Sequence, residues 1–229
     1  TNTTSMITTT DSALLRLLQL SSAALPVGGY AFSQGMEAAV EAGWLADEAA
    51  SGQWLGLQLE EAMARVDLPL LLRQLQAART ADVDQLCYWN AFTLACRESA
   101  EMRLGDTAMG EALVRLLGQL QVPLPDTLPR DRVFLTTFAL AAAHWQLDSR
   151  ATLLGYTWAW LENQVAAATK LVPLGQGAAQ RLLGEMAALV PAALDRAQGI
   201  ADEDIGASLP ALAMASAWHE TQYSRLFRS

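Results

Sequence analysis

Residues 149–172, SRATLLGYTWAWLENQVAAATKLV, carry apolar side chains at the spacing of one face of an α-helix. The apolar positions recur in alternating steps of four and three residues, which keeps them on one side of the helix. Asp148 comes directly before this stretch, where a side-chain oxygen can accept hydrogen bonds from free backbone amides. We therefore expect a long helix here, with one buried face made of Leu154, Trp158, Leu161, Val165, Ala168 and Val172.

Shorter stretches with the same spacing occur on both sides of this one. They comprise Leu113, Leu117 and Leu120; Phe134, Phe138, Ala141 and Trp145; and Leu182, Met186, Leu189 and Ala193. Asp11, Asp47 and Asp82 precede further apolar runs and are expected to cap helices as Asp148 does.

The composition favours helices over strands throughout. Val and Ile are few, whereas Ala, Leu, Gln, Glu and Arg, which favour helices, are abundant. Pro or Gly interrupts the pattern at residues 25–29, 123–129 and 173–177. We predict an all-α fold: a single compact helical bundle-like domain over residues 11–209, with about nine to ten helices and no significant sheet. The Thr-rich residues 1–10 are expected to be disordered.

Composition also excludes several classes of protein. The 229 residues are 52% hydrophobic and 17% charged, against about 25% charged in an ordinary globular domain, so a disordered chain is excluded. The longest uncharged stretch, residues 17–36, is broken by Pro26, and residues 133–147 fall short of the roughly 20 that a bilayer requires. We expect no membrane span. The net charge of −9 argues against binding to nucleic acid.

No residue pattern points to catalysis or to a resident cofactor. Cys87 and Cys96 lack CxxC spacing and lie far from His219, so no metal site is expected within one chain. His144 lies in an apolar run and is expected to be a buried, hydrogen-bonded imidazole. No phosphate-binding glycine motif occurs, and Ser33 lacks the strand-turn-helix context of a nucleophile elbow. We expect a protein that is not an enzyme and has no cofactor of its own.

The N-terminal composition and the use of cysteine favour a cytoplasmic location. No basic residue precedes Arg16, so a secretory leader is not expected. The two cysteines are expected to be reduced thiols.

Two segments have the composition of binding surfaces. Residues 25–30, LPVGGY, form a tight turn, because Pro fixes φ and Gly can adopt a positive φ. Residues 219–229, HETQYSRLFRS, place Tyr, Phe and two Arg in a segment with no following element. Tyr and Arg are enriched in binding hot spots. A plain helix connector and a frayed terminus are the alternatives.

These segments, with two others, closely resemble the UreF family of urease accessory proteins. The first match spans residues 20–44 and contains LSSAALPVGGY, SQGME and VEAGW. Residues 170–176, KLVPLGQ, and 219–229 follow in the family's order, and residues 96–103, CRESAEMR, resemble its polar mid-chain segment. The resemblance covers nearly the whole chain, with departures at Ala31, Phe32, Trp218 and residues 104–106.

The resemblance implies an all-helical, cytoplasmic chaperone of urease maturation. Members of the family associate with a second accessory protein, UreD (also called UreH), and with the GTPase UreG. That assembly couples GTP hydrolysis to the insertion of nickel into apo-urease, so nickel and GTP are handled by the assembly. Members of the family also tend to form homodimers.

The resemblance further implies where partners bind. Residues 210–229 would form a partner-binding tail, in which residues 219–229 dock on the UreD-type partner and order only when bound. Its expected contact residues are His219, Glu220, Gln222, Tyr223, Arg225, Leu226, Phe227 and Arg228. A surface facing the GTPase or a second copy would include Gly28, Gly29, Tyr30, Ser33, Glu37, Lys170 and Gln176.

Two other functions stay open at the level of sequence. A helical ligand-binding regulator would hold a small apolar molecule, although no basic helix-turn-helix pattern occurs. A dimeric nickel carrier would gather His219, Cys87 or Cys96 from two chains at a dimer axis.

Overall fold

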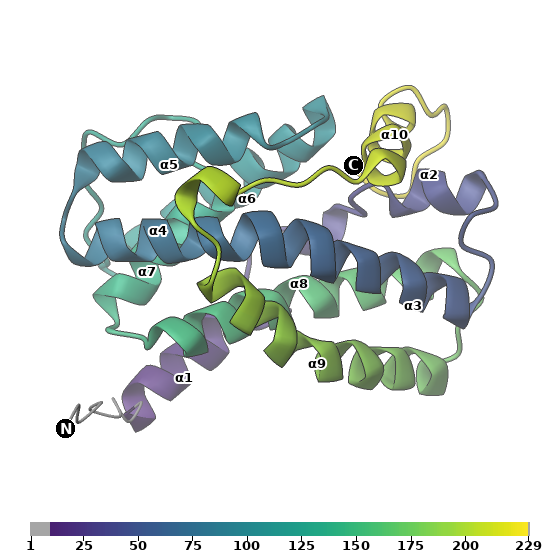
Figure 1. The fold of residues 1–229 in the computed structure, drawn as a ribbon, viewed down its shortest axis with the longest axis horizontal. Coiled ribbons are helices and arrows are strands. Elements are labelled where there is room, and N and C mark those ends of the chain that lie inside the picture. Colours follow the sequence, from purple (N-terminus) through teal and green to yellow (C-terminus); the bar gives the residue numbers. More distant parts are fainter. Residues whose placement is uncertain (1–9, 229) are drawn as a thin grey trace.

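The computed structural model describes residues 10–228, which are helical and contain no strand (Figure 1). The elements are α1 (Asp11–Leu20), η1 (Gly29–Ala31), α2 (Met36–Glu41), α3 (Glu48–Leu57), η2 (Gln58–Asp67), α4 (Leu68–Arg79), α5 (Val83–Ala95), α6 (Ala100–Gln119), α7 (Phe134–His144), α8 (Ser149–Leu171), α9 (Gln176–Gln198), η3 (Asp202–Asp204) and α10 (Pro210–His219). The predicted all-α fold is confirmed. None of the described helices is long and apolar enough to cross a bilayer.

The sequence signals for helix ends are largely confirmed. Asp47, Asp82 and Asp148 each accept a hydrogen bond from the backbone N–H three residues further on. The exception is Asp11, which is the first residue of α1. The cap of α1 is Thr10, whose hydroxyl accepts a hydrogen bond from the backbone N–H of Ala13 at 3.2 Å. The remaining residues expected to be disordered, 1–9, lie outside the described range.

α3, η2 and α4 form one continuous helical rod from Glu48 to Arg79 (Figure 1). Its middle section, η2, is a π-helix. Pro69, at the start of α4, has no N–H to donate to the carbonyl of Arg65 four residues earlier. The N–H of Gly206 donates to that carbonyl instead, at 3.2 Å. The rod is therefore tied to the segment between α9 and α10.

α4 lies in the centre of the bundle. It packs against α5, α7, α8 and α9, and its residues Leu68, Leu70, Leu71 and Leu75 are almost completely buried. A helix that is apolar on most sides needs neighbours on most sides. The same bundle leaves α2 and α10 together at one end of the molecule (Figure 1).

The long helix predicted over residues 149–172 is confirmed as α8, but only part of the face predicted to be buried is buried. Leu161 is fully buried, whereas Leu154 and Trp158 are 42% and 39% exposed. α1 packs on this half of α8, where the side chain of Leu17 lies directly against Gly155. The buried face of α8 is consequently rotated away from Leu154 and Trp158 near its N-terminus.

Candidate partner-binding site

The C-terminal segment folds back onto the helical domain. α10 packs against α2 and α6, and Phe227 beyond it is buried. The resemblance implied a partner-binding tail over residues 210–229, in which residues 219–229 order only on binding. The structure differs, because the described part of this segment packs on the domain with no partner present. The reason lies in two buried carboxylates that the segment satisfies.

The first carboxylate is that of Glu37 on α2. It accepts hydrogen bonds from the backbone N–H groups of Leu226 at 2.6 Å and Phe227 at 2.9 Å. Its Oε2 also lies 3.0 Å from Nε2 of His219. Three groups of the C-terminal segment thus converge on one side chain that is only 8% exposed. Such charge-assisted hydrogen bonds are about twice as strong as neutral ones.

The second carboxylate is that of Glu101 in the first turn of α6. Its Oε2 lies 2.7 Å from Nδ1 of His219, and its Oε1 accepts from Nη1 of Arg225 at 2.9 Å. An ionised carboxylate only accepts hydrogen bonds. The fully buried His219 therefore satisfies Glu37 and Glu101 together when each ring nitrogen carries a hydrogen.

The structure brings together three segments that are far apart in sequence. The backbone N–H of Arg228 donates to the carbonyl of Ala31 at 2.8 Å, next to the turn at residues 25–30. The ammonium of Lys170, at the end of α8, lies 5.3 Å from the centre of the Phe227 ring. The three segments singled out in the sequence thus meet around residues 226–228.

Burial divides the expected contact residues into two groups. The buried ones are Gly29, Ser33, Glu37, His219 and Phe227, and the half-buried ones are Gly28 and Gln222. The exposed ones are Tyr30, Lys170, Gln176, Glu220, Tyr223, Arg225, Leu226 and Arg228. In this conformation the exposed group can touch a partner, whereas the buried group holds the segment in place. Contact with a partner remains a prediction for the exposed group.

Sequence reasoning assigned no role to Glu101, Trp44 or Met214. In the sequence, Glu101 is an ordinary acidic residue in the first turn of a helix. Its role in holding the C-terminal segment follows only from its bonds to His219 and Arg225 in the folded protein. Trp44 follows α2 and packs against Trp218 of α10, with 5.3 Å between the ring centres and an angle of 56° between the ring planes. Trp218 and Met214 are both about half exposed on α10. The tryptophans at positions 44 and 218 were the feature of the sequence that could have indicated this contact.

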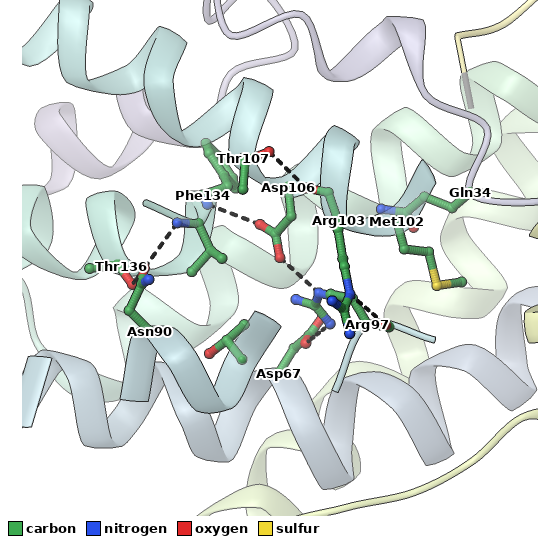
Figure 2. Close-up of polar contacts among 12 residues, drawn as sticks. Gln34, Asp67, Asn90, Arg97, Met102, Arg103, Asp106, Thr107, Phe134 and Thr136 are labelled. Carbon is green, nitrogen blue, oxygen red and sulfur yellow. Dashed lines mark hydrogen bonds and ion pairs between the residues drawn. The ribbon is translucent and has the colours of Figure 1, made fainter. Parts of the chain in front are cut away.

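A buried ion cluster fixes the part of the domain on which α10 rests. Figure 2 shows the carboxylates of Asp67 and Asp106 directed at Arg97, and both bonds are 2.7 Å long. Asp106 also accepts from the backbone N–H of Phe134 at 2.9 Å, which caps α7. Burial raises the pKa of Asp67, although the Arg97 guanidinium beside it opposes the shift. The cluster holds the connection between α5 and α6 in place.

Ser99 links this connection to α10. Its hydroxyl accepts from the N–H of Met102 and thereby caps α6. It also lies 2.6 Å from the hydroxyl of Ser216 on α10. Glu101 is consequently held at a defined position under the C-terminal segment.

Each of the two histidines has the environment that the sequence predicted for the other. His144 was expected to be buried, but it is exposed, because α7 emerges from the core in its last turn. His219 was expected on a polar tail and is fully buried. Among residues 10–228, no three His, Cys, Asp or Glu side chains group as ligands for a metal ion. Cys87 and Cys96 are free thiols.

Known proteins of one family are similar to this chain over almost its full length. A family model described as UreF matches residues 45–187. The urease accessory protein UreF of Marinomonas sp. (strain MWYL1) is 54% identical over 99% of this chain and 98% of its own length. That of Teredinibacter turnerae is 49% identical over 96% of this chain and 100% of its own. That of Pseudoalteromonas translucida is 46% identical over 96% of this chain and 95% of its own.

Proposed function

This chain belongs to the UreF family of urease accessory proteins and has a role in urease maturation; from that premise we propose that it is a non-catalytic chaperone. It links a UreD-type accessory protein (also called UreH) and a UreG-type GTPase to apo-urease in the cytoplasm, and it acts as a homodimer. The GTPase binds and hydrolyses GTP. The assembly, rather than this chain alone, inserts nickel.

The observation that carries the proposal is the exposed side of the C-terminal segment. Tyr223 is fully exposed and Leu226 is 66% exposed, while the backbone N–H groups of Leu226 and Phe227 donate to Glu37. A surface that is already ordered loses less conformational entropy when it binds. Tyr and Arg side chains are also typical of binding hot spots. We assign this surface, formed by Tyr223, Arg225 and Leu226, to the UreD-type partner.

The surface assigned to the GTPase lies beside it. Tyr30 is 65% exposed on η1, and the exposed Lys170 lies over Phe227. The two assigned surfaces adjoin because Arg228 is hydrogen-bonded to Ala31. Adjoining surfaces allow one chain to hold both partners at once, which supports the role of a scaffold.

Co-purification with the UreD-type partner tests the first assignment. We expect the double variant Tyr223→Ala and Leu226→Ala of the full chain to bind the partner at least about tenfold more weakly. The matched control is the double variant Tyr88→Ala and Leu57→Ala, whose side chains are 54% and 55% exposed elsewhere. Equal retention of the two double variants would contradict the assignment.

Urease activation in cells tests the function itself. With the gene deleted, we expect apo-urease to accumulate without activity, and the unaltered gene to restore it. Active urease in the deletion strain would refute the maturation role. Restoration by the Tyr223 and Leu226 double variant would refute only the surface assigned to the UreD-type partner.

A further inference from the structure

His219, the last residue of α10, is fully buried between acidic side chains of two other helices. Its Nε2 lies 3.0 Å from Oε2 of Glu37 on α2, and its Nδ1 lies 2.7 Å from Oε2 of Glu101 on α6. Both separations are those of hydrogen bonds. Each nitrogen of the ring therefore faces a carboxylate oxygen.

The two contacts of this ring need one hydrogen each. A neutral imidazole has one N–H and one bare nitrogen, and the bare nitrogen is an acceptor. An ionised carboxylate is an acceptor as well. A neutral ring between two carboxylates therefore leaves two acceptors facing each other in a buried place, which is unfavourable. Both contacts are complete when the ring of His219 is an imidazolium.

The other contacts of the two carboxylates favour their ionised form. Glu37 also accepts from the backbone N–H groups of residues 226–227, and Glu101 accepts from Nη1 of Arg225. Hydrogen bonds donated to a carboxylate stabilise its negative charge. The additional proton of the cluster therefore belongs on the ring of His219 rather than on either carboxyl group.

A charged ring also balances the charges of the cluster. Two carboxylates then face two cations, which are the imidazolium and the guanidinium of Arg225. Without the ring proton, one negative charge stays uncompensated beside a fully buried ring. A buried charge without a partner is strongly unfavourable.

The other charged groups of α2, α6 and the C-terminal segment face solvent or have contacts of their own. Glu41 is exposed, Asp106 is bonded to Arg97, Arg103 donates to the carbonyl of Arg97, Glu111 is paired with Arg115, Glu220 accepts from the N–H of Ala100, and Arg228 lies 5.9 Å from the centre of the Phe32 ring. The charge at His219 is therefore set by Glu37, Glu101 and Arg225.

We propose that a proton closes the C-terminal segment: the imidazolium of His219 holds Glu37 and Glu101, and release of its proton to the solvent loosens residues 219–228. In the open segment the ring is solvated, and a solvated imidazole has an ordinary pKa of about 6.5. Above that pH, closing takes up one proton, so its equilibrium constant falls by up to about tenfold per pH unit. Below that pH, the contribution of His219 to closing is fully present.

This proton also bears on partner binding. The segment carries Tyr223, Arg225 and Leu226, the surface assigned to the UreD-type partner. Any effect on that partner rests on the proposed function, whereas proton-linked closing is a property of the chain by itself. Experiments on the full chain without a partner therefore test this inference alone.

Nuclear magnetic resonance of the ring nitrogens tests the charge of His219. The chain contains two histidines, and His144→Gln, an exposed change at the end of α7, assigns their signals. We expect both nitrogens of His219 to carry hydrogen at about pH 7.5, where a solvated imidazole has mostly lost one. A bare ring nitrogen in the closed segment at that pH would overturn the proposal.

Hydrogen exchange of the backbone amides of Leu226 and Phe227, which donate to Glu37, measures how often the segment opens. We expect their protection factors, which correct for the direct effect of pH on exchange, to fall by up to about tenfold per unit between about pH 6.5 and 8.5. Protection that stays constant or rises over this range would contradict the proposal.

Glu101→Gln separates the proton from the positions of the hydrogen bonds. Its amide nitrogen can donate to a bare Nδ1 of His219 while its oxygen accepts from Arg225, so a neutral ring completes the cluster. We expect this variant to keep residues 226–227 protected and to lose the pH trend.

Glu111→Gln, an exposed change on the same helix, is the matched control and should keep the pH trend. Equal trends in Glu101→Gln and Glu111→Gln would refute the role of the proton. The ring signals and the protection factors of the unaltered protein decide the proposal without either variant.

Discussion

At the residue scale, Glu37 is the side chain on which the C-terminal segment depends most. We expect Glu37→Gln to lower the free energy of unfolding by about 2 kcal/mol, because an amide replaces a charged acceptor of three hydrogen bonds. Trypsin should also cut after Arg225 faster, since the segment opens more often. Denaturant unfolding and timed proteolysis measure the two effects.

Glu41→Gln is the matched control for this change, because Glu41 is an exposed acid on the same helix. It should alter neither unfolding nor cleavage. If Glu37→Gln behaves like Glu41→Gln, the buried carboxylate does not hold the segment.

Asp67 makes stability depend on pH in an unusual direction. Its pKa in the folded protein is raised by burial above the ordinary value, so the folded protein binds this proton more tightly than the unfolded chain does. Asp67 therefore favours folding at acidic pH, and this contribution is lost as the pH rises through the pKa of the folded state. We expect the stability of the unaltered protein relative to Asp67→Asn to fall as the pH is raised from the ordinary carboxyl range towards neutrality.

Urea unfolding at a series of pH values measures this difference. Asp84→Asn, an exposed change near the start of α5, is the control and should show no comparable trend. A difference between the unaltered protein and Asp67→Asn that is constant or grows with pH would contradict the direction given by burial.

At the element scale, the packing of α6 on the start of α7 depends on Gly110. A Cβ at this position would collide with the backbone carbonyl of Arg132, which cannot move as a side-chain end could. We expect Gly110→Ala to lower the free energy of unfolding by about 1–3 kcal/mol through overpacking. Thermal or denaturant unfolding measures the loss.

Gly118 offers the matched control on the same helix. A Cβ there meets no atom within 4 Å, so Gly118→Ala should raise stability by about 0.5–1 kcal/mol through helix propensity. Opposite signs for the two changes are the expected result. Equal effects would mean that α6 does not approach residue 132 as closely as described.

At the scale of the whole molecule, the C-terminal segment is part of the fold. Deletion of residues 210–229 removes the buried Leu212, Ala215 and Phe227 together with the groups that are bonded to Glu37 and Glu101. We expect the shortened chain to keep most of its helical circular dichroism and to lose at least about 3 kcal/mol of stability. An unchanged melting temperature would show that the segment contributes nothing to the domain.

Much of the architecture could be predicted from local patterns. Asp47, Asp82 and Asp148 mark helix starts because a cap acts on backbone N–H groups two or three residues away. The π-helical section of the rod could not be predicted in this way. Its apolar residues fit an ordinary helix, and the N–H of Gly206 that donates to the carbonyl of Arg65 comes from far along the chain.

Helical class, helix ends and family membership follow from the amino-acid sequence alone, since each depends on residues close together in the chain or on long matching segments. Burial does not. Trp158 shares the periodicity of the buried Leu161 but is exposed, and His144 and His219 have environments opposite to those that their neighbours in sequence suggest. Which side chains are covered depends on the distant elements that pack against them. Glu37 and Glu101, more than a hundred residues before His219, make that residue a buried anchor.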